Sequence, residues 1–179
     1  MSKFIDEFIE TWKKVITTPG DFYKEMPTSG GYEEPLKFAA INYLIAGIGA
    51  ALISFGSLFG AVIAAPILGI VGIFIGGLIL HICFKIVGGS GSYEGTVRTV
   101  SYASAISAVS WIPIVGWILG LYAIYLSIVG GTFVHNLTMG KSAIAVFIPI
   151  IILIILGVLL FAMVAALIAS IGLGGLCNL

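Results

Sequence analysis

The charged side chains of this chain are confined to a few short segments, and the sequence between those segments is apolar. Residues 38–84 contain no Asp, Glu, Lys or Arg, and neither do residues 99–140 or 142–179. One crossing of a bilayer takes about 20 apolar residues in a helix, so the first two runs are each long enough for two crossings. Soluble domains carry about 25% charged residues, whereas this chain carries 9%. The pattern predicts an integral membrane protein.

The apolar runs are predicted to be helices. Within lipid, backbone polar groups are satisfied only in helices or closed barrels, and barrel strands alternate apolar and polar residues. Residues 148–156 are Ile, Leu and Pro without alternation. The fold class predicted is therefore all-α, with five transmembrane helices at about residues 36–58, 64–87, 96–112, 115–135 and 142–171, separated by glycine-rich or proline-containing turns.

The positions of the basic residues predict the topology. All eight Lys and Arg lie before or at the start of the first span, around the loop after the second span or in the loop after the fourth. Basic residues in short loops stay in the cytoplasm. We therefore expect a cytoplasmic N-terminus, a C-terminus outside the cell, and a multi-pass protein of the cytoplasmic membrane. Residues 1–34 form the predicted cytoplasmic segment, and residues 35–179 the transmembrane domain.

The first residues are predicted to form an amphipathic helix. Apolar residues recur there at intervals of three and four, as on one face of a helix, namely Phe4, Ile5, Phe8, Ile9, Trp12, Val15 and Ile16. Two interpretations remain open. The helix lies in the cytoplasmic headgroup layer, with Trp12 at the interface, or it packs on the cytoplasmic ends of the bundle.

Small residues dominate the predicted third span, which includes Ser101, Ser104 and Ser107. Small side chains allow helices to approach closely, so we favour close packing, and a polar lining of a pore or pocket is the alternative. Two GxxxG patterns, Gly72 with Gly76 and Gly116 with Gly120, also favour close helix contacts. We expect those contacts within the bundle rather than between chains.

Polar residues at the cytoplasmic ends of the spans form a second candidate site. They are His81, Lys85, Glu94, Arg98, Tyr102, His135 and Lys141. Glu94 and Arg98 have the i,i+4 spacing of a helical ion pair. The functional interpretation is a pocket for a lipid headgroup, an ion or a partner protein, and the alternative that we favour is interfacial anchoring.

Several chemistries have no support in the sequence. No acid or lysine lies near the middle of a span, where ion-coupled pumps need one. No nucleophile–base pair, metal-ligand pattern or phosphate-binding loop is present, so we expect no enzyme activity, cofactor or metal. The formal net charge is zero, so no nucleic acid partner is expected. Cys83 and Cys177 are predicted to be unpaired thiols.

Several pieces of the sequence resemble the YIP (Ypt-interacting-protein) family in its short prokaryotic form. The matching pieces are Trp12 with residues 17–23, residues 34–36, residues 88–98, Tyr102-Ala103, residues 111–116, His135 and residues 140–143. The resemblance implies a non-enzymatic protein with five spans and a cytoplasmic N-terminus. Eukaryotic relatives are associated with membrane traffic and Rab-type GTPases, a role that we do not carry over to this chain.

The leading hypothesis is a protein that organises the bilayer or a membrane complex through its cytoplasmic face. Membrane lipids are its expected partners, with another membrane or peripheral protein as an alternative. The rival hypothesis is a channel or transporter for a small solute, lined by the serine-rich third span. A lipid-modifying enzyme is the weakest, because no catalytic set supports it.

Overall fold

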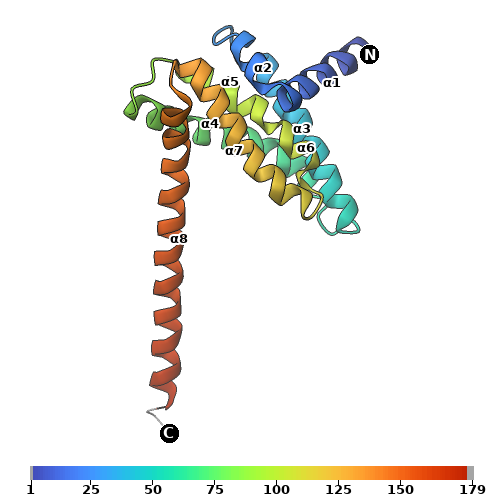
Figure 1. Cartoon of the computed structure of the whole chain (residues 1–179). Coiled ribbons are helices and arrows are strands. Elements are labelled where there is room, and N and C mark those ends of the chain that lie inside the picture. Colours follow the sequence, from blue (N-terminus) through green and yellow to red (C-terminus); the bar gives the residue numbers. More distant parts are fainter. Residues whose placement is uncertain (1, 177–179) are drawn as a thin grey trace. The chain divides into compact units, whose positions relative to one another are not determined.

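Helices make up most of the part of the chain that the structure describes. The computed structural model describes the backbone of residues 2–176 and the side chains of residues 3–166 and 168. In chain order the elements are α1 (Ser2–Thr17), α2 (Pro19–Glu25), α3 (Glu33–Ile53), α4 (Ala61–Ile86), α5 (Tyr93–Ala103), the 3₁₀ turn η1 (Ser104–Ile106), α6 (Ser107–Ser110), α7 (Val115–His135) and α8 (Met139–Leu176) (Figure 1). Within the described residues, α3, α4, α7 and α8 up to Ala166 are long and apolar enough to cross a membrane. The chain is therefore an all-helical, multi-pass membrane protein.

The chain divides into two compact units. The described residues up to Val146 form the first unit, and those from Phe147 onward form the second. In the second unit, α8 continues past Pro149, and all residues from Ile151 to Ala166 are apolar and exposed. A helix that is apolar around its whole circumference is typical of a membrane span. Cys177 lies outside the described residues, and Cys83 is a free thiol buried in the first unit.

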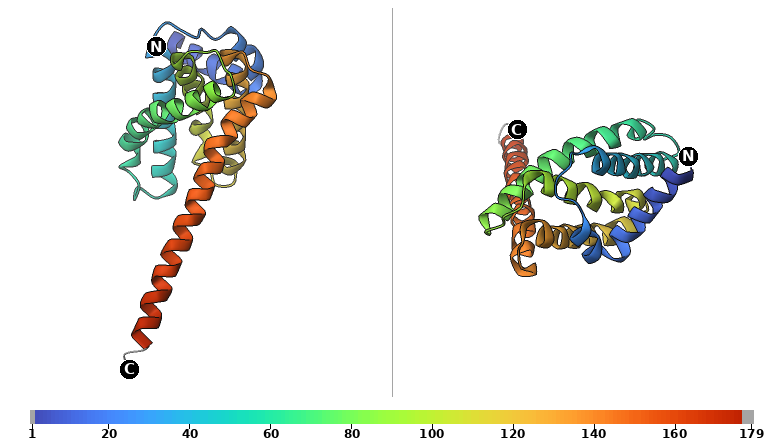
Figure 2. Two further views of the ribbon diagram at one scale, coloured as in Figure 1. Left: turned by 90° about the vertical axis from the view of Figure 1, so that its left-hand side faces the viewer. Right: turned by 90° about the horizontal axis from the view of Figure 1, so that it is seen from above.

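The first unit is a bundle of α3, α4, α7 and the α5–η1–α6 segment. α3 and α4 pack along each other as a hairpin, and small residues at their contact allow the close approach. A Cβ placed on Gly47 would lie 2.5 Å from the Ala61 carbonyl oxygen, and one on Gly69 would lie 2.4 Å from the Tyr43 ring. Seen from above in Figure 2, α5 and α6 lie between this hairpin and α7, in agreement with their contacts to all three helices.

The predicted spans agree with the structure to different degrees. α7 has the predicted bounds of 115–135, and α4 begins three residues before the predicted 64–87. α3 ends at Ile53 rather than at 58, because the chain then turns through Phe55 and Gly56 with positive φ angles of 51° and 84°. Glycine adopts such angles without a steric penalty, and this explains why the turn is placed here.

The predicted third span, 96–112, is not one continuous α-helix. α5 begins at Tyr93 and ends at Ala103, and a 3₁₀ turn separates it from the single turn of α6. The Ser104 hydroxyl donates to the Ser101 carbonyl at 2.6 Å, and the Trp12 indole donates to the Ala105 carbonyl at 2.9 Å. Side chains that bond to helix carbonyls compete with the backbone ladder and tighten or bend a helix. The serines that favoured close packing therefore also accompany the break in the helix.

α1 and α2 pack against the side of the bundle through their apolar residues. The Tyr122 hydroxyl donates to the Ile16 carbonyl at 2.6 Å, and Val15 is fully buried. In α2, Tyr23 is buried and donates to the Thr99 carbonyl at 3.2 Å; burial raises the pKa of its phenol. Residues 1–34 thus belong to the same compact unit as α3 to α7.

Candidate functional site

The C-terminal turns of α4, the start of α5 and the end of α7 meet at two histidines and a threonine. His81 Nδ1 lies 3.0 Å from the Thr96 hydroxyl oxygen, and His135 Nε2 lies 2.8 Å from the same atom. The two imidazole centroids are 5.5 Å apart. We call these three residues the histidine cluster. It joins three helices through one hydroxyl group.

The single proton of the Thr96 hydroxyl determines which groups of the histidine cluster donate hydrogen bonds and which accept them. The hydroxyl also donates to the carbonyl of Ser92, the N-cap residue of its own helix, at 3.2 Å. A hydroxyl has one proton and two lone pairs, so when it donates to Ser92 both imidazoles must donate to it. His135 Nδ1 is then an acceptor, and this buried atom has no hydrogen-bond partner among the described residues.

Tight packing surrounds His135. The side chain is 1% exposed and stacks on Phe84, with ring centroids 4.5 Å apart. The loop that connects α4 to α5 passes over it, where a Cβ on Gly91 would lie 2.3 Å from the Val134 carbonyl oxygen. Within the described residues, no group of three or more His, Cys, Asp or Glu side chains is placed to hold a metal ion. The arrangement is a packed hydrogen-bonding centre.

A second polar group lies on the other face of α5. The Arg98 guanidinium donates to the Gly31 carbonyl, and the Gly31 N–H donates to Glu94 Oε1 at 2.6 Å. Arg98 Nη1 and Glu94 Oε1 are 3.9 Å apart, so the ion pair expected from their spacing is present. Arg98 is 6% exposed. The pair therefore clamps the backbone of the segment between α2 and α3 onto the start of α5.

The structure distributes the predicted cytoplasmic cluster over several places. His81 and His135 lie in the histidine cluster, and Glu94 and Arg98 lie in the clamp. Lys85 and Lys141 are exposed, and neither forms an ion pair with a described residue. Tyr102 lies on the side of α5 that faces α1, α2 and α3, with its ring 4.9 Å from Phe22 and 5.3 Å from Phe38.

The surface of the first unit has two neighbouring hollows, and Thr11 and Tyr102 line both of them. One, which we call the α1–α3 hollow, has a volume of about 90 Å³ and is lined chiefly by Glu7, Phe8, Glu34, Lys37, Phe38 and Tyr102. The other, the α1–α2 hollow, has a volume of about 550 Å³ and is lined by residues that include Thr11, Asp21, Phe22, Glu25 and Tyr102. Aromatic rings and carboxylates thus occur together in both hollows.

The serines of the third predicted span bond mainly to their own helix. Ser101 is buried and donates to the Val97 carbonyl at 2.8 Å, and Ser104 is also buried. Ser107 is half-buried and lines a groove of about 310 Å³ together with Ser104, Gly116, Gly120 and Ser127. Close packing accounts for Ser101. For Ser107, which lines the groove, the alternative of a polar lining remains.

The two GxxxG patterns have different environments. A Cβ on Gly116 would lie 2.2 Å from the Ser110 carbonyl oxygen, so this glycine allows a contact within the bundle, as expected. Cβ atoms on Gly72, Gly76 and Gly120 would meet nothing within 4 Å. Among the described residues, close contacts of the expected kind are therefore absent around Gly72, Gly76 and Gly120, and α4 turns Gly69 and Gly77 toward its neighbours instead.

The sequence did not reveal that Thr96 and Gly31 take part in these polar contacts. A lone threonine in a helix commonly bonds only to its own backbone, and a glycine in a linker carries no chemical signal. The helical spacing of α5 offered one indication. Glu94 and Arg98 share a face, and Thr96, two residues from each, is on the opposite face, so both faces of this short helix carry a polar group.

Comparison with known proteins identifies a family. The Yip1 domain matches residues 13–162, which extend from the C-terminal part of α1 into α8. No curated protein and no solved structure matches the chain. The match covers the histidine cluster, the clamp and most of both hollows, and it confirms the resemblance to the YIP family.

Proposed function

This chain belongs to the Yip1 domain family, and from that membership and the packing of α1 we propose that it organises the bilayer or a membrane protein complex through its cytoplasmic face. The family is in general one of non-enzymatic membrane proteins. On this proposal the chain has no enzymatic activity, and its partners are membrane lipids and, in a complex, another membrane or peripheral protein.

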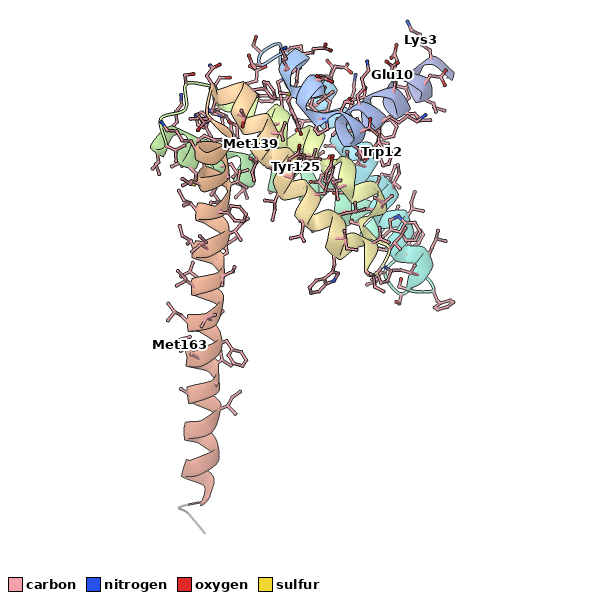
Figure 3. The ribbon with its side chains drawn as sticks, viewed as in Figure 1. Lys3, Glu10, Trp12, Tyr125, Met139 and Met163 are labelled. Atoms are coloured by element: carbon pink, nitrogen blue, oxygen red, sulfur yellow. The ribbon has the colours of Figure 1, made fainter. Side chains whose placement is uncertain are left out.

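The observation that carries the proposal is the division of the apolar stripe of α1. Phe8, Trp12 and Ile16 pack against the rest of the first unit, whereas Phe4, Ile5 and Ile9 are 54%, 49% and 43% exposed. Figure 3 shows Trp12 on the side of α1 toward the bundle, and Lys3 and Glu10 on its outer side. An apolar edge on a helix that packs beside membrane spans is suited to the headgroup layer. The two interpretations of this helix are thus compatible.

Variants of α1 test this proposal. Ile5→Ser/Ile9→Ser removes two of the three exposed apolar side chains, and Asp6→Ser/Lys13→Ser is the matched control, since it alters two exposed polar residues without changing the net charge. We expect native mass spectrometry of the protein released gently from its membrane to detect a lipid or a second polypeptide in fixed ratio. The apolar variant should lose this component and the control should keep it. A bare protein, or equal retention by both variants, would contradict the proposal.

We further propose that the chain crosses the cytoplasmic membrane five times, with its N-terminus in the cytoplasm. The support is that α5–η1–α6 begins beside the segment before α3, through Arg98 and Gly31, and reaches Gly49 of α3 through Trp111. The segment thus runs along most of α3. The distribution of Lys and Arg supports the same orientation.

Reporter fusions test this topology. With five crossings, a green fluorescent protein is expected to fluoresce at the N-terminus, and a phosphatase that folds only outside the cytoplasm is expected to be active at the C-terminus. The reverse fusions, with the phosphatase at the N-terminus and the green fluorescent protein at the C-terminus, are the controls and should give no signal. Reporters that place both termini on the same side would show that α5–η1–α6 does not cross.

Transport is a second candidate function, favoured by the groove that Ser104, Ser107 and Ser127 line. On this alternative the groove forms part of a path for a small solute. Solute uptake into proteoliposomes that Ser107→Leu abolishes and Ile118→Leu leaves unchanged would support it; Ile118 is exposed on α7. Uptake equal to that of empty liposomes would count against it.

A further inference from the structure

We propose that the α1–α3 hollow binds the headgroup of one zwitterionic phospholipid, with the lipid ammonium group between carboxylates and aromatic rings and its phosphate at Lys37. The inference rests on the proposed function, because it requires α1 to lie in the headgroup layer. It deepens that function by identifying the chemical class of lipid and the residues that select it.

A row of aromatic rings lines the hollow. The rings of Phe8 and Phe38 are 5.2 Å apart, and those of Phe38 and Tyr102 are 5.3 Å apart. The faces of aromatic rings carry partial negative charge and attract cations, and quaternary ammonium ligands are recognised in this way. The row therefore favours an alkylammonium group over a neutral or anionic headgroup.

Carboxylates contribute the opposite charge for such a cation. Glu7 and Glu34 line the hollow from α1 and α3. Glu7 is 3.8 Å from Lys3, and Glu34 is 3.5 Å from Lys37, in each case through one carboxylate oxygen. A carboxylate has two oxygens that accept hydrogen bonds. Each of these glutamates can therefore accept a further hydrogen bond from an ammonium group.

Lys37 can bind the lipid phosphate next to the site of the lipid ammonium group. Its ammonium group is 2.7 Å from Glu33 and 3.5 Å from Glu34. A lysine has three N–H donors, so one donor remains after both contacts. An acid pair and a lysine in one hollow match the two charges of phosphatidylethanolamine or phosphatidylcholine, and they match a singly anionic lipid less well.

Apolar residues continue the hollow toward the acyl part of a lipid. Phe4 and Ile41 also line it, and Phe4 is exposed next to Ile5 on the proposed membrane edge of α1. The volume of about 90 Å³ suits a headgroup amine rather than a whole lipid. The acyl chains would then remain in the surrounding bilayer.

Lipid binding to the purified full-length protein tests the inference. Native mass spectrometry would compare phosphatidylethanolamine with phosphatidylglycerol of the same acyl chains. We expect the first complex to form about tenfold more tightly, as one charge-assisted cation–π site supplies about that factor. Glu7→Gln/Glu34→Gln should abolish the preference, and Asp6→Asn/Glu10→Gln, which removes the same charge from outside the hollow, should keep it.

Three results would overturn the inference. They are equal binding of the two lipids, equal loss of the preference in the control variant, and binding of soluble glycerophosphoethanolamine as tight as that of the lipid. The last would identify the occupant as a soluble phosphodiester with an ammonium group rather than a lipid. None of these outcomes would contradict the proposed membrane contact of the α1 edge, because Ile5 and Ile9 do not line the hollow. Failure of the proposed function would instead appear in the Ile5→Ser/Ile9→Ser comparison.

Discussion

Replacing Thr96 by valine is expected to destabilise the first unit more than any other loss of a single hydroxyl group. The substitution keeps the volume of the side chain but removes the oxygen that contacts both His81 and His135. Two imidazole nitrogens then lose their partner at once, one of them on a side chain that is 1% exposed. Because a buried polar group left unpaired costs about 1–3 kcal/mol, we expect a loss of about 3 kcal/mol in the free energy of unfolding.

The matched control is Thr96→Ser, which keeps the hydroxyl and removes only a methyl group. Its expected loss is about 1 kcal/mol, the scale of one buried methyl group. Thermal unfolding of both variants in the same detergent measures the difference, with the valine variant melting at the lower temperature. A valine variant as stable as the serine variant would show that the packing of Thr96, and not its hydroxyl, holds the three helices together.

The distribution of charge was sufficient to predict the class of the protein and much of its helical structure. Bilayer physics makes this possible, because a span must be long, apolar and helical. α7 has both predicted bounds since Pro113 and the polar residues after His135 delimit it in the sequence. The N-terminal helix was predicted from its periodicity, but the periodicity did not show which residues of the stripe face the bundle and which stay exposed.

Features that depend on pairs of helices could not be predicted in the same way. The 3₁₀ turn after Ala103 accompanies a hydrogen bond from Trp12 to the Ala105 carbonyl, 93 positions away in the sequence. The histidine cluster requires α4, α5 and α7 to place three side chains around one oxygen. A sequence shows that Gly72 and Gly76 share a helix face, but it does not show that a Cβ at either position would meet no neighbour within 4 Å.

The division of the predicted cytoplasmic cluster has a physical reason within α5. Residues four apart lie on one face of a helix and residues two apart lie on opposite faces, so a single short helix separates the Glu94–Arg98 clamp from Thr96. The clamp fixes the segment before α3, and Thr96 fixes the ends of α4 and α7. α5 therefore connects the N-terminal helices to the transmembrane bundle, and a change at either face is expected to affect the position of α1.

The glycines of α7 provide the other large expected effect. A Cβ on Gly130 would lie 2.2 Å from Thr99 Cγ2 and 3.2 Å from the Tyr23 ring, so Gly130→Ala forces α5 away from α7. Overpacking of a filled interior costs about 1–3 kcal/mol, and we expect a loss in the upper part of that range. Gly120→Ala is the control on the same helix. Its Cβ would meet nothing within 4 Å, and alanine favours a helix over glycine.

A second substitution identifies the clash itself. Thr99→Ser removes the Cγ2 atom that a Cβ on Gly130 would meet and keeps the hydroxyl that donates to the Gly95 carbonyl at 3.0 Å. In a Gly130→Ala chain this change is therefore expected to restore part of the lost stability, although alone it removes a buried methyl group. Thermal unfolding of the two single variants and the double variant measures the coupling. Additive losses would show that the cost of Gly130→Ala comes from elsewhere, since two groups that clash must be coupled.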